Sequence, residues 1–158
     1  MSGKSRHGPN RLTNYLGTHE TVMAQWAARG FLLVDGLEFG AFGGGYFVIN
    51  GTLQCLGNIV VEVDKVLQVV DGDGSTARVQ TVWYRYNARL PGKGVIVRYD
   101  SPHDHRPVHH AHRFDVLAAT PTERIELSED GDWPVLGEVL EELEAWYYAH
   151  YGQLSNDT

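Results

Sequence analysis

The sequence predicts an α+β fold, an antiparallel β-meander with an amphipathic C-terminal helix packed on one face and a short N-terminal helix. Three β-rich runs separated by Gly-containing turns indicate the meander. An apolar repeat of 3.6-residue period near the C-terminus indicates the helix. A length of 158 residues fits one domain. We expect that domain to span 18–152, between a flexible arm over 1–17 and a short tail over 153–158.

The N-terminal third reads as one helix and two strands. Apolar residues recur at helical spacing over Thr18–Arg29, with Thr18 as the N-cap and Gly30 as the stop. Phe31–Asp35 and Tyr46–Ile49 are rich in β-formers. The glycines between them are followed by neither a Lys-Ser/Thr helix start nor a GxGxxG spacing, so we expect a hairpin loop rather than a nucleotide site.

The meander is predicted over Ile59–Val70, Ala77–Leu90 and Val95–Asp100, joined by tight turns at Asp71–Gly74 and Pro91–Gly94. Symmetric pairing about both turns sorts the side chains into two faces. The first face is mostly apolar and would hold Ile59, Val61, Val63, Val82, Tyr84, Tyr86, Val95, Val97 and Tyr99. The second is mostly charged and would hold Glu62, Asp64, Trp83, Arg85, Asn87, Arg98 and Asp100.

The C-terminal helix follows Asp132-Trp133-Pro134, where an Asp and an early Pro mark a helix start. Its apolar stripe comprises Val135, Leu136, Val139, Leu140, Leu143, Trp146 and Tyr147, and glutamates fill the positions between. The helix should end near Gly152 and cover the apolar face of the meander. The charged face is then left for function.

Charge is distributed unevenly along the chain. The net charge is −7, yet residues 76–113 contain seven Lys/Arg against two acids, whereas residues 114–147 contain ten acids against Arg124 alone. A basic half can bind an anion while an acidic half maintains solubility or meets a partner. The lone Cys55 excludes an internal disulfide, and no long apolar run is present. We expect a cytoplasmic protein with no membrane partner.

The most informative segment is 98–113, which holds five of the eight histidines together with three arginines. Histidine exchanges protons near neutral pH and is also the commonest metal ligand. The interleaved arginines oppose a cation and no Cys is nearby, so we expect a site without a metal cofactor. The alternative is zinc, for which the candidate ligands are His103, His105, His109, His110 and His112.

Two ordered motifs in this segment carry a family resemblance. They are Arg98-Tyr99-Asp100-Ser101-Pro102-His103 and His109-His110-Ala111-His112, preceded by the acidic run Gly57–Asp64 and by Trp83-Tyr84-Arg85-Tyr86. The chain over 31–150 resembles the TumE family, toxins of two-gene toxin–antitoxin modules, or a neighbouring family with the same motifs. Ser101 stands where that family's pattern has Asn, and Ala111 where a basic residue is common. The resemblance implies a growth-inhibiting protein with a cognate antitoxin.

RNA cleavage by the 2′-hydroxyl needs a base, an acid and positive charge at the phosphorus. We assign proton transfer to His109 with His112 or His103, and orientation of an imidazole to Asp100. Arg98 and Arg85 would stabilise charge, Trp83 or Tyr84 would stack on a base, and Arg113 would add substrate binding. A metal-dependent hydrolase and a non-catalytic interaction module remain alternatives, and we expect the chain to be able to pair with a second copy of itself.

Overall fold

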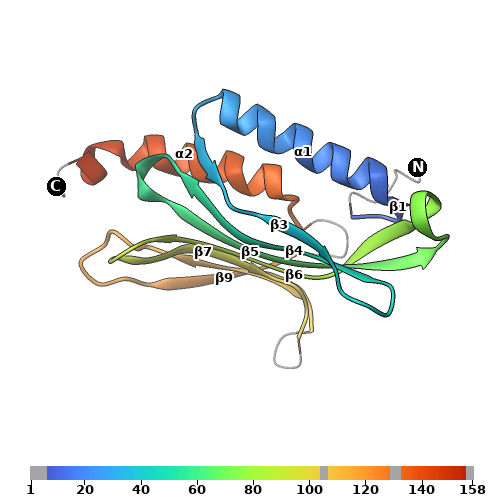
Figure 1. Ribbon diagram of the computed structural model, residues 1–158. Helices are drawn as coiled ribbons and strands as arrows, with labels where there is room; N and C mark the ends of the chain where they lie inside the picture. The colour runs from blue at the N-terminus through green and yellow to red at the C-terminus, as the bar shows by residue number, and fades with distance from the viewer. Residues whose placement is uncertain (1–6, 104–106, 129–132, 156–158) are drawn as a thin grey trace, which may run out of the picture.

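The computed structural model describes residues 7–103, 107–128 and 133–155. Two helices, α1 (Leu12–Ala28) and α2 (Leu136–Ser155), lie on the same side of one antiparallel sheet (Figure 1). This arrangement confirms the predicted α+β class. His105, Asp132 and both ends of the chain, on which parts of the prediction fall, lie outside the described residues.

Nine strands form the sheet in the described part of the chain. They are β1 (Asn10–Arg11), β2 (Leu32–Asp35), β3 (Glu38–Ala41), β4 (Tyr46–Cys55), β5 (Val60–Asp71), β6 (Arg78–Leu90), β7 (Gly94–Asp100), β8 (His109–Phe114) and β9 (Glu123–Ser128). The main path runs β2-β4-β5-β6-β7-β8-β9, while β1 pairs with β6 and β3 pairs with β4. Each strand therefore lies next to its sequence neighbour along most of the path.

The predicted meander corresponds to β5, β6 and β7, and most of its predicted faces are confirmed. Three register shifts interrupt its pairing, and two of them change the predicted faces. The first lies between the pairs Val66–Trp83 and Leu67–Thr81, so Val82 is an extra residue and is exposed rather than buried. The second lies between the pairs Ala88–Val97 and Arg89–Val95, so Ile96 is the extra residue. Ile96 is buried, and Val95 does not join the apolar face as predicted. One inserted residue switches the side of the sheet to which the next side chain points.

Four strands were not predicted, among them β1, which lies in the expected N-terminal arm. β3 lies inside the expected hairpin loop, and β8 and β9 lie in the histidine-rich segment and beyond it. β8 reads His-His-Ala-His-Arg-Phe, a composition without the usual β-branched residues. It forms a strand because β7 and β9 supply main-chain partners on both of its edges. The histidine-rich segment is thus partly built into the sheet.

The predicted start of the N-terminal helix is wrong. The helix begins at Leu12 rather than at Thr18, because Leu12, Tyr15 and Leu16 pack on the sheet against a buried cluster. The residues before it are held as well, since β1 pairs with β6 and the His7 Nε2 lies 2.9 Å from the carbonyl oxygen of Trp133. The expected arm over 1–17 therefore includes β1 and the first turns of α1. None of the described helices has the length and apolar character needed to cross a membrane.

The core lies between the sheet and the helices. Its most deeply buried members are Phe31, Leu53, Ile59, Val61, Val63, Tyr84, Tyr86, Val139, Leu140 and Leu143. On the same side, the Tyr99 hydroxyl donates a hydrogen bond to the Glu142 carboxylate of α2. Arg98 and Asp100 alternate with Tyr99 and therefore point to the opposite face. We call this uncovered face the outer face.

Lys65 is the one charged side chain on β5 that is buried under α1. Its ammonium lies 4.9 Å from the centre of the Tyr15 ring, and no carboxylate of the described residues pairs with it. Burial lowers the pKa of Lys65 from 10.5 to about 8. The charged form is therefore less favourable in the folded protein than in the unfolded chain.

This pKa difference predicts a pH-dependent stability. Between the folded value of about 8 and the unfolded value of 10.5 the unfolded chain binds more protons, so stability should rise with pH in that window. Lys65→Met should therefore stabilise the protein at about pH 7, and its advantage should shrink at about pH 9.5. Urea unfolding at both pH values measures this. Lys93→Met, in an exposed turn, is the control, and an advantage independent of pH would contradict the explanation.

Candidate functional site

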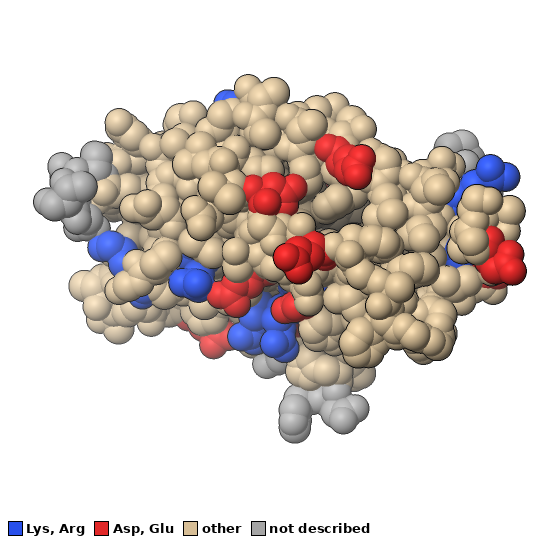
Figure 2. All heavy atoms as spheres, viewed as in Figure 1, with Lys and Arg blue, Asp and Glu red and all other residues tan. Residues whose placement is uncertain are grey.

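The charged and imidazole side chains of the outer face gather where β6, β7 and β8 lie side by side. The register places Arg85, Asp100 and His110 in one row across these three strands. The next row along the strands contains Arg98 and His112. We call the outer-face cluster the set formed by Arg85, Arg98, Asp100, His103, His110, His112 and Glu123. Figure 2 shows cationic and acidic side chains intermixed along the lower edge of the molecule, where Figure 1 shows the sheet rather than the helices.

Asp100 is the centre of this cluster. Its carboxylate is only 4% exposed and accepts a hydrogen bond from each of two arginines. The Arg85 Nε donates to Oδ1 at 3.0 Å, and the Arg98 Nε donates to Oδ2 at 2.9 Å. The terminal nitrogens of both guanidinium groups make no hydrogen bond to any other described residue. Because both side chains are partly exposed, these donors remain accessible to an anion.

The two buried histidines are each held by their Nδ1 atom. The His112 Nδ1 lies 2.6 Å from a Glu123 carboxylate oxygen, and the His110 Nδ1 lies 2.9 Å from the carbonyl oxygen of Val108. Both oxygens can only accept, so each neutral imidazole has its proton on Nδ1. The Nε2 atom of each ring then has an unprotonated lone pair. This is the tautomer that binds metals or accepts a proton through Nε2.

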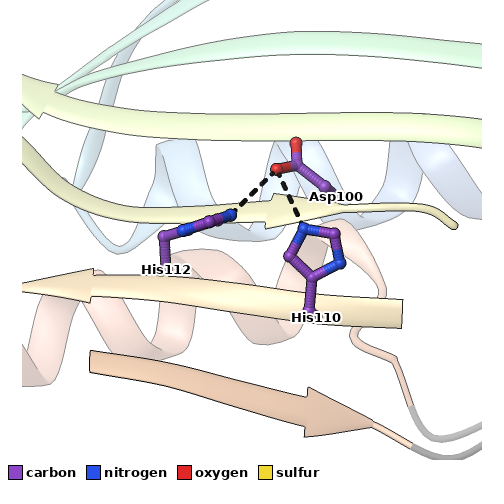
Figure 3. Close-up of side chains that lie close together, drawn as sticks. All are labelled: Asp100, His110 and His112. Carbon is purple, nitrogen blue, oxygen red and sulfur yellow. Dashed lines mark ion pairs between the residues drawn. The ribbon is translucent and has the colours of Figure 1, made fainter. Parts of the chain in front are cut away.

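Both of these Nε2 atoms point at the same carboxylate oxygen (Figure 3). The Asp100 Oδ2 lies 3.5 Å from the His110 Nε2 and 3.6 Å from the His112 Nε2. The His110 Nε2 is buried and has no hydrogen-bond partner in the described part of the chain. Three Lewis bases thus converge, with their ligand atoms within 4.8 Å of one another. Such an arrangement calls for a shared proton or a cation between them.

His103 and Trp83 lie at the rim of the cluster. The His103 ring contacts the His110 ring edge-on with centroids 5.1 Å apart, and the residue is exposed. The Arg85 guanidinium lies 5.9 Å from the centre of the Trp83 ring, which is 36% exposed. Both were predicted site residues, and the structure places His103 at the rim of the cluster and Trp83 next to it. Trp83 therefore offers an accessible aromatic surface next to an arginine.

His109 and Tyr84, by contrast, lie on the helix side of the sheet. Alternation along β8 turns His109 away from His110 and His112. Its Nδ1 lies 2.8 Å from the Tyr84 hydroxyl, and both rings stack with Trp133. Tyr84 is 1% exposed, so it cannot stack on a bound base as predicted. Burial raises the pKa of the Tyr84 hydroxyl above its ordinary value.

Arg113 is also separated from the cluster. It hydrogen-bonds the carboxylates of Glu126 and Glu142 and donates to the Tyr99 hydroxyl at 2.9 Å. These contacts join β8 to β9 and α2 on the helix side. Hydrogen bonding to Arg113 lowers the pKa of Glu126 below its ordinary value, because the guanidinium stabilises the charged carboxylate. The guanidinium of Arg113 is thus paired with protein carboxylates on the helix side, away from the outer-face cluster.

Glu123 is the member of the cluster that sequence reasoning missed. It lies on β9 beyond the histidine-rich segment, and only the pairing of β8 with β9 brings it beside His112. His110 entered the prediction only as an alternative metal ligand. The signal for His110 was the spacing of the histidines along His109–Phe114. If this segment is a strand, its two-residue period places His110 and His112 on one face of the sheet and His109 on the other.

The importance of Asp100 for the cluster can be measured through stability. Asp100→Asn removes a buried charge that holds two guanidinium groups, and it should destabilise the protein by about 1–3 kcal/mol. Glu62→Gln breaks the neighbouring outer-face pair with Arg89, whose partners are 41% and 38% exposed, and should cost less than about 1 kcal/mol. Urea unfolding compares the two variants. Equal effects would show that burial of Asp100 adds nothing to its interactions.

Comparison with known proteins provides no family assignment. No family model, curated protein or solved structure matches the chain. The resemblance to the TumE family therefore stays a prediction that rests on the two motifs. The function of the protein has to be inferred from the geometry of the outer-face cluster.

Proposed function

We propose that the outer-face cluster binds a phosphodiester group of RNA and catalyses its cleavage. The proposal rests on one observation: the buried Asp100 carboxylate accepts hydrogen bonds from both Arg85 and Arg98 and so fixes their orientation. Each arginine is held through its Nε, which leaves the planar edge of terminal N–H groups for a ligand. Such an edge matches the paired oxygens of a phosphate. Two guanidinium groups on adjacent strands can therefore hold the phosphate and stabilise negative charge that develops on it.

Next to this anion site lie the groups that the chemistry requires. The lone pairs of the His110 and His112 Nε2 atoms are basic positions within the cluster. His103 is exposed at the rim and is suited to donate a proton to the leaving oxygen. The exposed ring of Trp83 beside Arg85 provides a stacking surface for an unpaired base. The substrate class that uses all four features is single-stranded RNA.

The resemblance to the TumE family is in keeping with this activity. Its first motif supplies Arg98, Asp100 and His103, and its second supplies His110 and His112. Pairing of β7 with β8 brings Arg98, Asp100, His110 and His112 together on the outer face, and the His103 ring contacts the His110 ring. We accordingly propose that the chain is a cytoplasmic toxin that acts on RNA and is restrained by a cognate antitoxin protein.

The cleavage proposal predicts a strong effect of Arg98→Gln. Loss of one charge-stabilising donor should slow cleavage of single-stranded RNA by roughly 10²–10³-fold, because the remaining arginine alone faces the phosphate. Arg124→Gln, on β9 and outside the cluster, is the matched control. Cleavage is followed by gel electrophoresis of end-labelled RNA with protein whose thermal unfolding is measured in parallel.

Growth provides a second readout of the same variants. Expression of the parent chain alone should slow growth, and Arg98→Gln should relieve the effect while Arg124→Gln should not. Undiminished cleavage and toxicity in Arg98→Gln would contradict the assigned role of the arginines. A parent protein that neither cleaves RNA nor slows growth would refute the proposed function itself and leave a non-catalytic interaction module.

A further inference from the structure

We infer that Asp100, His110 and His112 form a binding site for one divalent transition-metal ion, for which Zn²⁺ and Co²⁺ are the probes. Two imidazoles and one carboxylate are donors that such ions prefer, whereas Mg²⁺ and Ca²⁺ prefer an all-oxygen set. Ion binding would stand without the proposed function. Only the role of the ion in cleavage rests on it, and with the ion bound the His110 and His112 Nε2 lone pairs hold the ion instead of acting as bases.

Distances between the three donors fit a shared ion. Ligands at the usual zinc distances of roughly 2.0–2.2 Å lie about 3.4 Å apart in a tetrahedral site. The two Nε2 atoms lie 3.5 Å and 3.6 Å from the Asp100 Oδ2. These separations are too long for strong hydrogen bonds but match two edges of a tetrahedron around an ion. One ligand atom from each of the three residues lies within 4.8 Å of the other two.

The unpaired nitrogen of His110 is an independent observation. The residue is 1% exposed, and its Nε2 is aimed at Asp100 without a hydrogen bond among the described residues. Two neutral imidazoles that direct lone pairs at a carboxylate repel it electrostatically. A cation between the three groups removes this repulsion and satisfies the buried nitrogen.

A surrounding set of contacts already orients the proposed ligands. Metal-bound histidines commonly donate the N–H of the other ring nitrogen to a carboxylate or a carbonyl oxygen. Glu123 provides the first kind of acceptor for His112 and Val108 the second kind for His110. Asp100 is oriented in the same way by Arg85 and Arg98. These contacts hold all three ligands in place before the ion enters.

Local charge also permits a cation, contrary to the expectation from the sequence. The arginines near the site are paired with Asp100, and Glu123 adds a second negative charge beside His112. With neutral imidazoles, the two guanidinium charges are thus balanced by two carboxylates. An ion would make the cluster positive overall. That field suits a phosphodiester held at the terminal nitrogens of the arginines, where a phosphate oxygen can complete the coordination of the ion.

The test uses untagged full-length protein freed of metal by dialysis against a chelator. Titration should show one tightly bound Zn²⁺ per chain, and Co²⁺ should give visible absorption bands typical of nitrogen and oxygen ligands. His112→Ala should abolish both signals. Glu123→Gln, which keeps all three ligands, should weaken Zn²⁺ affinity about 10–100-fold. His150→Gln, on α2, is the matched histidine control and should bind as the parent does.

Folding is checked for every variant by thermal unfolding, and Glu123→Gln keeps the test valid if His112→Ala fails to fold. Absence of Zn²⁺ and Co²⁺ binding by the folded parent, or unchanged affinity in a folded His112→Ala, would overturn the site. RNA cleavage separates the two proposals. Cleavage by metal-free protein in chelator would overturn the catalytic role of the ion and leave the proposed function standing. Stoichiometric Zn²⁺ without any cleavage would support the metal site and refute the proposed function.

Discussion

The buried carboxylate of Asp100 is the interaction on which the outer face depends. It holds two arginines from adjacent strands and faces two imidazoles from a third strand. A charge this deeply buried is tolerated only when donors surround it. The hydrogen bonds that stabilise Asp100 therefore also determine where the arginines point. Stability and anion binding are served by the same contacts.

The division of the sheet into two faces explains why such a cluster can exist. Both helices pack on one face and bury the apolar and aromatic side chains, so the other face carries no helix of the described chain (Figure 1). Arg113 and His109 belong to the packed face and are used there in contacts with α2, Tyr84 and Trp133. Neighbouring residues of one strand thus have separate tasks because alternate side chains leave the sheet on opposite sides.

Buried ionisable groups mark two places where the described part of this protein departs from an ordinary hydrophobic core. Under α1, Lys65 lies beside the Tyr15 ring, and burial lowers the pKa of its ammonium. Its charge is therefore destabilising near neutral pH. On the outer face, Asp100 and the two histidines compensate one another only in part, since the His110 Nε2 lacks a hydrogen bond within the described residues. An incompletely satisfied buried site of this kind is typical of ligand-binding positions.

The sequence by itself determined the α+β class, the three-stranded meander, its two faces and the apolar stripe of α2. These features follow from local patterns, namely the period of apolar residues and the chemistry of tight turns. It also identified Arg85, Arg98, Asp100, His103 and His112 as residues of one region. Tertiary structure alone decided that His110 and Glu123 join them while His109, Tyr84 and Arg113 do not. That choice depends on the strand register of a segment with no apolar pattern, and register is set by partners far away in the chain.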